Sequence, residues 1–365
     1  MSIQSTHRPG RPHPALSRRA LLAGTAAGAV GLSLAACGKG KKAGSQADSK
    51  TVTVVTHDSF HVSENLQKAF TSETGYTLKI ATSGDAGALV NKLVLTKDAP
   101  LGDAVFGIDN TYATRALDQG VIDTSATVTL PKGAESYVVA DTPALAPIDV
   151  GDVCLNIDTG YFTGKGLTPP ATFEDLTKPE YKGLLVAINP TNSSPGMAWL
   201  LATIGHFGAG SFAGYWKQLM ANGARIAEDW SAAYETDFSG SGKGTYPIVV
   251  SYASSPSFTV SKDKSSSTTS ALLDTAFRQV EYAGVLKGAA NPEGGKAFVT
   301  WMLSKAVQED IPGQMYMYPV LPDAALPEAL TKFGPLSKSP VKVDPKEITT
   351  HREEWLNTWT EAVGK

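Results

Sequence analysis

Apolar and polar positions alternate along the first part of the chain in a repeating strand and helix pattern. A β-branched run at residues 52–56 predicts a buried strand, and the next segment predicts a helix that begins near Ser63 and ends at Gly75. Similar runs predict two more strands, each followed by a helix, at residues 77–81 and 104–108. Strands that alternate with helices at this spacing favour a parallel sheet with right-handed crossovers.

The same alternation returns in the second half of the chain. The predicted strands lie at residues 184–188 and 247–252, and the predicted helices lie at residues 196–207 and 212–222. An extended stretch around residues 146–155 joins the two blocks. We therefore expect an α/β fold of two lobes, each a mostly parallel sheet flanked by helices, with a ligand cleft between them.

The first 36 residues carry the pattern of an export signal. Arginines without any acidic residue precede a small, apolar stretch at residues 20–36, which is too short and too rich in Gly and Ala for a stable membrane span. The pair Arg18-Arg19 resembles a twin-arginine signal, although paired arginines are also common in ordinary signal peptides. We expect residues 1–36 to be a signal peptide that is removed.

Small residues directly before Cys37 resemble the bacterial lipoprotein box, in which the cysteine is acylated and becomes the mature N-terminus. The resemblance implies lipidation of Cys37, and each buried CH₂ group of the lipid contributes about 0.8 kcal/mol to anchoring. Residues 37–50 then form a hydrophilic tether with nothing to bury. The expected location is the outer face of the cell membrane, or the periplasm, with the membrane as a partner through the lipid anchor.

The mature chain that we expect is mildly acidic. Without the four arginines of residues 1–36, 28 basic side chains stand against 35 acidic ones, a formal net charge of −7. This balance gives no electrostatic reason to bind nucleic acid, and it favours a cationic ligand weakly. Only Cys154 remains once Cys37 is acylated, so we expect no internal disulfide and a Cys154 that packs in the core.

Polar residues follow several of the predicted strands directly. In open α/β sheets a ligand lies beyond the carboxyl ends of the strands, where loops and helix N-termini meet. The segments at these positions are residues 57–60, 107–110, 189–196 and 251–256. We expect the binding site to be built from them.

Six short motifs occur in order along the chain, and together they point to one family. They are D-S-F at residues 58–60, G-x-D-N at 107–110, S-x-P-G at 193–196, W-S-x-A-Y at 230–234, S-Y-x-x-S-P at 251–256 and M-Y-P-V at 317–320. With this set, the chain from Val52 onwards resembles the thiamine-binding lipoproteins and periplasmic proteins of bacterial uptake transporters. The resemblance implies a type II periplasmic binding protein fold, a ligand that is thiamine or one of its phosphate esters, and delivery to the permease of an ABC transporter. It also implies a monomer with no cofactor and no catalytic activity.

The chain of this family crosses between its lobes more than once. We expect an N-terminal lobe of residues 51–148 with about residues 279–313. The C-terminal lobe is then residues 149–278 with about residues 314–365. Candidate contacts on both blocks predict that the lobes close on the ligand by a hinge motion.

Thiamine has a thiazolium cation, a flat aminopyrimidine and a hydroxyethyl or phosphate tail, so its pocket needs aromatic faces, carboxylates and hydrogen-bond donors. Trp230 and Tyr234 are four residues apart and share one face of a helix, although Tyr234 fits the core equally well. Asp149 is a further candidate carboxylate, but a turn explains it better. The expected ligand-binding residues are Asp58, Ser59, Asp109, Asn110, Asn192, Ser193, Ser194, Gly196, Trp230, Tyr234, Tyr252, Ser254 and Tyr316.

Two departures from the family pattern leave the preferred form of the vitamin open. His57 stands where relatives carry a Tyr, and Tyr316 stands where they carry a Trp. The cage around the cation is therefore expected to be leaner, and the choice among thiamine, its monophosphate and its diphosphate is not fixed by the sequence.

Other functions compete with this interpretation. A polyamine or ferric iron on the same fold is the main alternative, since fold alone does not define the ligand. An exported metal-dependent enzyme is a weaker one, because the chain has no G-x-S-x-G motif and the Gly-rich segment at residues 240–245 lacks the spacing of a phosphate loop. His57 and His61 beside Asp58 suggest a metal site, but two imidazoles in one loop more often line a surface or a pocket.

Overall fold

The structure, a computed structural model, describes residues 50–241 and 243–364. The predicted signal peptide, the lipidation at Cys37 and the tether up to residue 49 lie outside the described residues. Among the helices that are described, none combines the length and the apolar character needed to cross a membrane.

The N-terminal lobe is built on three parallel strands. β1 (Thr51–Thr56) lies between β2 (Thr77–Thr82) and β3 (Ala104–Asp109). The helices that connect or follow these strands are α1 (Glu64–Thr74), α2 (Ala86–Leu95) and α3 (Ala113–Asp118). The predicted strands and the predicted parallel arrangement are confirmed. The valines of β1 and all residues of β3 are buried, as is usual for parallel strands that helices cover.

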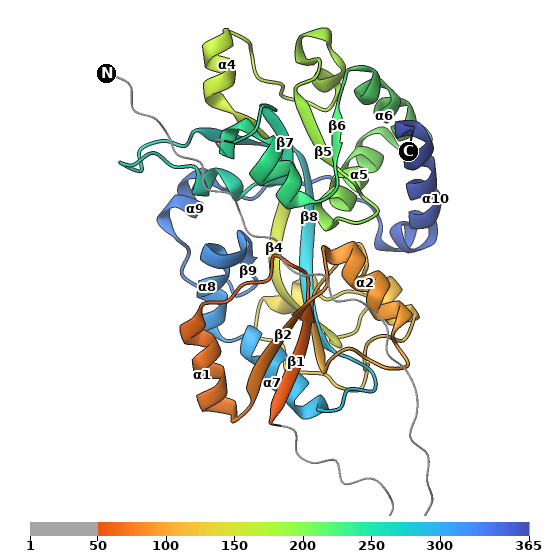
Figure 1. Cartoon of the computed structure of the whole chain (residues 1–365), viewed down its shortest axis with the longest axis vertical. Coiled ribbons are helices and arrows are strands. Elements are labelled where there is room, and N and C mark those ends of the chain that lie inside the picture. The colour runs from red at the N-terminus through yellow and green to blue at the C-terminus, as the bar shows by residue number, and fades with distance from the viewer. Residues whose placement is uncertain (1–49, 242, 365) are drawn as a thin grey trace, which may run out of the picture. The chain divides into compact units, whose positions relative to one another are not determined.

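Two long antiparallel strands connect the lobes. β4 (Leu145–Asp158) and β8 (Thr269–Val285) pair along almost their whole length, and Figure 1 shows both running from one half of the molecule into the other. The end of β8 pairs with β3, whereas the end of β4 pairs with β7, so each strand belongs to both lobes. Their register shifts twice along the way, which marks irregular points at the crossing.

The C-terminal lobe repeats the pattern of strands and helices. β5 (Leu185–Ile188) lies between β7 (Ile248–Tyr252) and β6 (Arg225–Ala227), and these strands are parallel. The helices of this lobe that pack beside the sheet include α4 (Thr159–Lys165), α5 (Ser194–Phe207) and α6 (Phe212–Ala221). The predicted strands and helices of this block are confirmed to within about two residues at each end.

The last third of the chain returns to both lobes. α7 (Pro292–Met302) and α8 (Lys305–Met315) pack on the N-terminal half, and β9 (Tyr318–Pro319) pairs with β4. The helices α9 (Glu328–Phe333) and α10 (Pro345–Val363) then pack on the C-terminal half, α10 against α6 (Figure 1). The exact lobe boundaries stay a prediction.

Aromatic side chains hold α10 in place. The rings of Trp199 and Trp216 meet edge to face with centroids 5.1 Å apart, and Trp216 meets Trp359 of α10 in the same way at 5.6 Å. All three are fully buried, so they join α5, α6 and α10 in one core. Cys154 is also buried and free, as predicted, and burial raises the pKa of its thiol.

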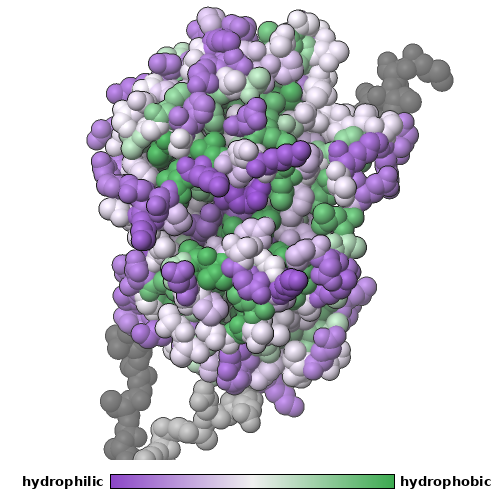
Figure 2. Space-filling view, turned by 180° about the vertical axis from the view of Figure 1, so that it is seen from behind, coloured by the Kyte–Doolittle hydropathy of each residue, from purple (hydrophilic) through white to green (hydrophobic). Residues whose placement is uncertain are grey.

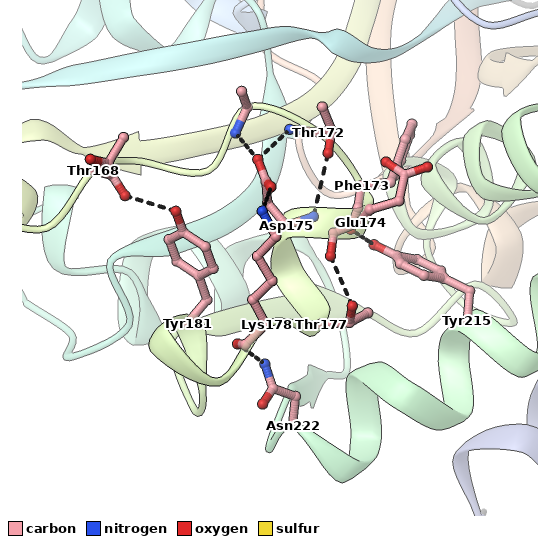
Figure 3. A network of polar contacts seen from close by, with 11 residues as sticks. Thr168, Thr172, Phe173, Glu174, Asp175, Thr177, Lys178, Tyr181, Tyr215 and Asn222 are labelled. Carbon is pink, nitrogen blue, oxygen red and sulfur yellow. Dashed lines mark hydrogen bonds and ion pairs between the residues drawn. The ribbon is translucent and has the colours of Figure 1, made fainter.

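A polar network fixes the irregular segment before β5 (Figure 3). Oδ2 of Asp175 accepts hydrogen bonds from the N–H groups of Ala171 and Thr172, and Oδ1 lies 2.6 Å from Nζ of Lys178. The hydroxyl of Tyr215 on α6 donates to the carbonyl of Phe173 over 2.9 Å. The segment is thus tied to α6 by hydrogen bonds at a position that does not line the cavity described below.

The lobes also touch each other beside the crossing strands. The N–H of Gly87 on α2 donates to the carbonyl of Asn192 over 3.1 Å, and the guanidinium of Arg352 on α10 lies 4.1 Å from the centre of the Tyr112 ring. The hydroxyl of Thr349 donates to that of Thr114 over 2.8 Å. On the opposite face from Figure 1, hydrophilic and hydrophobic residues are interspersed over both lobes (Figure 2).

Candidate functional site

A cavity of about 270 Å³ is lined by residues of both lobes. Its volume is close to the roughly 300 Å³ at which small-molecule pockets begin. The segments that follow β1, β2, β5 and β6 all reach it, and so do the last residue of β7 and the segment directly after α8. The cavity therefore lies at the carboxyl ends of the strands, where the sequence predicts the ligand.

Aromatic rings form one wall of the cavity. The rings of Trp230 and Tyr234 stack with centroids 5.0 Å apart and planes 11° apart, as their spacing in the sequence suggests. Tyr316 meets Trp230 edge to face at 5.9 Å, and the centroid of the Phe258 ring lies 3.7 Å from that of Tyr316. Trp230, Tyr252 and Tyr316 line the cavity, whereas Tyr234 lies buried behind Trp230.

Local backbone features hold this wall. Trp230 precedes a π-helical turn (Ala232–Asp237), and Nε1 of its indole donates to Oγ of Ser251 over 3.0 Å. Tyr316 ends α8 in the left-handed conformation with φ of 64°, which is uncommon for an aromatic residue. A residue keeps such a conformation only where the surrounding structure holds it, and residues of this kind cluster at binding sites.

Acidic side chains form another part of the wall. Four carboxylates line the cavity, those of Asp58, Asp85, Glu235 and Glu281. Among the described residues that line it, none is Lys or Arg. Such a cavity attracts a cation and repels an anion.

Among the described residues of the wall, the one basic group is an imidazole that is paired with an acid. Nε2 of His57 lies 3.3 Å from Oε1 of Glu281, and both side chains are buried. Burial alone would lower the pKa of His57, but the charges of Glu281, Asp85 and Asp58 overcome this effect and raise it. His57 therefore offsets the charge of at most one of these four carboxylates, Glu281 being its nearest partner.

Two further acids lie behind the wall in one row across the sheet. Glu281 on β8 is directly opposite Asp109 on β3 and Asp149 on β4. Burial raises the pKa of Asp109 to about 7, although Thr111 donates to its Oδ1 from both its N–H and its hydroxyl over 2.6 Å. Burial, together with Glu281, raises the pKa of Asp149 well above its usual value. Both acids are buried and neither lines the cavity, so a role of Asp109 in binding stays a prediction, whereas Asp149 lies in strand β4 and not in a turn.

The structure brings only part of the predicted set to the cavity. The residues that line it are Asp58, Ser59, Ser194, Trp230, Tyr252 and Tyr316. The residues that do not are Asp109, Asn110, Asn192, Ser193, Gly196, Tyr234 and Ser254.

Three of the residues that do not line the cavity make structural contacts. The amide of Asn110 bonds the backbone of Arg278 and Val280, and the amide of Asn192 bonds Glu228. A side chain at Gly196 would meet the Asn189 carbonyl at 2.8 Å, so this glycine allows α5 to start close to β5. These residues shape the loops that carry the site.

Several lining residues are not among those predicted from the sequence. Asp85, Glu235, Glu281 and the methionines on either side of Tyr316 all line the cavity. Asp85 could have been found by applying the rule of carboxyl ends to the second strand as well. Glu281 is an acid inside a buried strand, which is itself a signal of a site.

Metal ligands do not gather in the described part of the chain. No group of three His, Cys, Asp or Glu side chains there is placed to hold a metal ion. His61 is exposed and does not line the cavity, so the pair of imidazoles considered above is not brought together at the site.

Comparisons with known proteins agree with this architecture. The chain is 27% identical over 324 residues to the thiamine-binding periplasmic protein of Escherichia coli. The alignment covers 86% of this chain and 94% of that protein. It is 27% identical over 329 residues to the protein of the same name in Brucella suis, with 86% and 92% covered.

Solved structures give the same result for the fold. A periplasmic thiamin binding protein superposes with a TM-score of 0.75 at 25% identity, over 86% of this chain and 96% of that one. Iron-bound HitA of Pseudomonas aeruginosa superposes with a TM-score of 0.67 at 20% identity, over 86% and 99%. The two-lobed type II periplasmic binding protein fold that the motifs implied is confirmed.

The sequence model of one family, described as bacterial extracellular solute-binding protein, matches residues 103–334. This match spans β3 to α9 and thus includes both strands that connect the lobes. The chain belongs to the bacterial extracellular solute-binding protein family.

Proposed function

We propose that this protein captures thiamine outside the cytoplasm and delivers it to the permease of an ABC transporter. The observation that carries the proposal is the cavity wall, which combines three aromatic rings with four carboxylates and has no Lys or Arg among the described lining residues. The similarity to proteins named as thiamine-binding supports the same ligand.

The chemistry of the ligand matches that of the wall. A thiazolium ring carries a permanent positive charge, and each aromatic face against it would contribute about 0.5–2 kcal/mol. Trp230, Tyr252 and Tyr316 offer such faces. Asp58 is held by the N–H of Gly84, which donates to its Oδ1 over 3.0 Å, so its second oxygen can accept from the amino group of the pyrimidine.

A polyamine is the second candidate, because four acids in one cavity also suit a chain of ammonium groups. The stacked rings favour the flat vitamin over a flexible amine, whose charges need carboxylates more than ring faces. Ferric iron fits the wall less well, since no three ligating side chains gather in the described residues.

Export and anchoring are part of the proposal. A signal peptide at residues 1–36 would direct secretion, and a lipid on Cys37 would keep the mature protein at the membrane through the tether of residues 37–50. The protein would act there as a monomeric binding protein without catalysis or cofactor. A Cys37→Ala variant should move from the membrane fraction to the soluble fraction on cell fractionation, and retention in the membrane would argue against the anchor.

Ligand capture would involve closure of the lobes about β4 and β8. These strands belong to both lobes, and their register shifts at two points between them. Small-angle scattering should give a smaller radius of gyration with thiamine than without it. An unchanged radius would contradict hinge closure.

The experiment that tests the ligand is mass spectrometry of small molecules released from the natively purified protein. We expect thiamine or one of its phosphate esters in amounts that approach one per protein molecule. Stoichiometric putrescine or spermidine in its place would overturn the proposal in favour of the second candidate.

A further inference from the structure

One imidazole is built into the wall of the cavity. His57 packs against Phe106 with 5.4 Å between the ring centroids, and a Cβ on Gly107 would overlap the imidazole, so glycine leaves room for the ring there. Nε2 of His57 lies 3.3 Å from Oε1 of Glu281, and more than nine-tenths of each side chain is buried. The fold therefore holds the imidazole in one place, where it lines the cavity beside a carboxylate.

Glu281 carries a negative charge at this place. Its Oε1 also accepts a hydrogen bond from Nε2 of Gln279 over 3.3 Å. Asp109 on β3 and Tyr252 on β7 lie near Glu281, and burial raises the pKa of both. Burial, the charge of Glu281 and a side-chain hydrogen bond with it raise the pKa of Asp149, which is opposite on β4, well above its usual value. Asp149 therefore keeps the proton of this pair, and the charge stays on Glu281.

Protonated His57 is the cation that the cavity wall itself supplies. Burial alone would lower the pKa of His57, but the charges of Glu281, Asp85 and Asp58 raise it above the ordinary value of 6.5. These acids face the ring from β8, from the start of α2 and from its own loop. Among the described residues that line the cavity, none is Lys or Arg. The charged form of the ring is thus favoured by carboxylates on three elements.

A cationic ligand and the proton on His57 compete for the same carboxylate. Two positive charges in one buried site repel strongly, because the surroundings screen them little. A thiazolium ring cannot lose its charge, whereas His57 loses its charge by releasing one proton to the solvent. Ligand binding should therefore lower the pKa of His57. The affinity for the cation then rises as the pH rises through the raised pKa of the free protein.

Resting on the proposed function, we propose that Glu281 is the counter-ion of the bound thiazolium, and that protonated His57 holds this place until the vitamin binds and displaces its proton. Capture then exchanges one cation for another at a buried carboxylate. A neutral ligand would leave the proton on His57, so release of a proton to the solvent marks a cation bound at Glu281.

Calorimetric titration with thiamine at pH 6.5, in cacodylate and in Bis-Tris buffer, tests this exchange. The buffers differ in their enthalpy of ionisation, so the difference between the measured heats gives the number of protons released. We expect about 0.5–1 proton per bound thiamine, because a His57 with a raised pKa is more than half protonated at this pH. The affinity should be at least about fourfold higher at pH 8 than at pH 6.

Two substitutions separate the roles of the pair. His57→Gln removes the titrating group, so proton release should fall below about 0.2 and the affinity should change less than about twofold between pH 6 and pH 8. At pH 6 this variant should bind thiamine more tightly than the unmodified protein, because no cation of the wall competes. Glu281→Gln removes the counter-ion, so it should bind thiamine about tenfold or more weakly at pH 8. It should also lose the proton release, since the charge of Glu281 raises the pKa of His57.

Glu235→Gln is the matched control, because it removes a carboxylate of the same wall that lies outside the group of acids around His57. Its proton release should equal that of the unmodified protein, and circular dichroism checks the fold of all three variants.

Three results would overturn the exchange. They are no proton release by the unmodified protein, undiminished release in His57→Gln, which would place the proton on an acid such as Asp85, and full thiamine affinity in Glu281→Gln. Failure of the unmodified protein to bind thiamine at any pH would instead overturn the proposed function.

Discussion

The indole of Trp230 lies flat against the ring of Tyr234, with 5.0 Å between their centroids and 11° between their planes. One of the two rings lines the cavity and the other is buried behind it. Trp230 faces the cavity, and Tyr234 holds the indole of Trp230 in position.

Removal of the indole should weaken ligand binding without unfolding the protein. Trp230→Ala deletes a ring that faces the cavity, so we expect the dissociation constant for thiamine to rise about tenfold, equivalent to about 1.4 kcal/mol. Calorimetry measures the change, and circular dichroism checks the fold. Tyr161→Ala on α4 removes an aromatic ring away from the cavity and should leave the constant unchanged. An unchanged constant in Trp230→Ala would exclude Trp230 from the site.

The contact of α2 with the loop after β5 should affect affinity although it does not line the cavity. A Cβ at Gly87 would lie 2.7 Å from the Asn192 carbonyl oxygen and 2.6 Å from the Tyr112 hydroxyl. Gly87→Ala should therefore hold the lobes apart and weaken thiamine binding by roughly threefold to tenfold, because closure costs more free energy.

Gly164→Ala on α4 is the control for this substitution. A Cβ there meets no atom within 4 Å, so affinity should not change. If Gly87→Ala binds thiamine as tightly as the unmodified protein, the contact between the lobes has no role in closure.

The buried acid Asp109 should make stability depend on pH. Its pKa is about 7 in the folded protein against an ordinary value of 3.8. Between these two pH values the folded state keeps a proton on Asp109, whereas the unfolded state has released it. Its contribution to stability is complete below the ordinary value and is lost as the pH rises towards 7. Asparagine does not titrate, so Asp109→Asn should remove this loss. The change in the free energy of unfolding caused by the substitution should be more favourable at pH 7.5 than at pH 4.5, by on the order of 2 kcal/mol.

Urea unfolding of the ligand-free protein at the two pH values measures this difference. The same stabilisation at both values would show that Asp109 is not the group that titrates. Thiamine affinity at neutral pH should change little, because Asp109 does not line the cavity.

Asp175 should contribute to stability and not to binding. Lys178 and the backbone N–H groups of Ala171 and Thr172 lower its pKa, so its contribution is present above the ordinary value and is lost as the pH falls through the lowered one. Asp175→Ala removes two backbone hydrogen bonds (Figure 3) and should cost about 1–2 kcal/mol at pH 7. A lower melting temperature with an unchanged dissociation constant is the expected pair of results, and a weakened constant at an unchanged melting temperature would contradict it.

The two α/β blocks and the first connecting strand could be predicted from the sequence, but the second connecting strand, β8, could not. Residues 52–56 and 104–108 were recognisable because parallel strands buried on both faces are continuously apolar. β8 was missed because Arg278, Gln279 and Glu281 interrupt its apolar run, and their burial depends on pairing with β3 and β4, which are distant in the sequence.

The site was predicted only as far as local signals reached. Asp58 and Ser194 lie in the segments that follow β1 and β5, and both line the cavity, as the rule of carboxyl ends predicts. Asp109 also lies at the carboxyl end of a strand, but its side chain accepts hydrogen bonds from Thr111 and does not line the cavity. No pattern in the sequence indicates this orientation. Glu281 reaches the cavity from the middle of a strand, and only the crossing of β8 between the lobes brings it there.

The most direct test of the whole account is calorimetric titration of the ligand-free protein with thiamine, putrescine and ferric citrate. We expect one thiamine bound per molecule with a dissociation constant below about 1 μM, equivalent to about 8 kcal/mol, and no binding heat from the other two ligands. Tight binding of putrescine or ferric citrate, with no heat from thiamine, would contradict it.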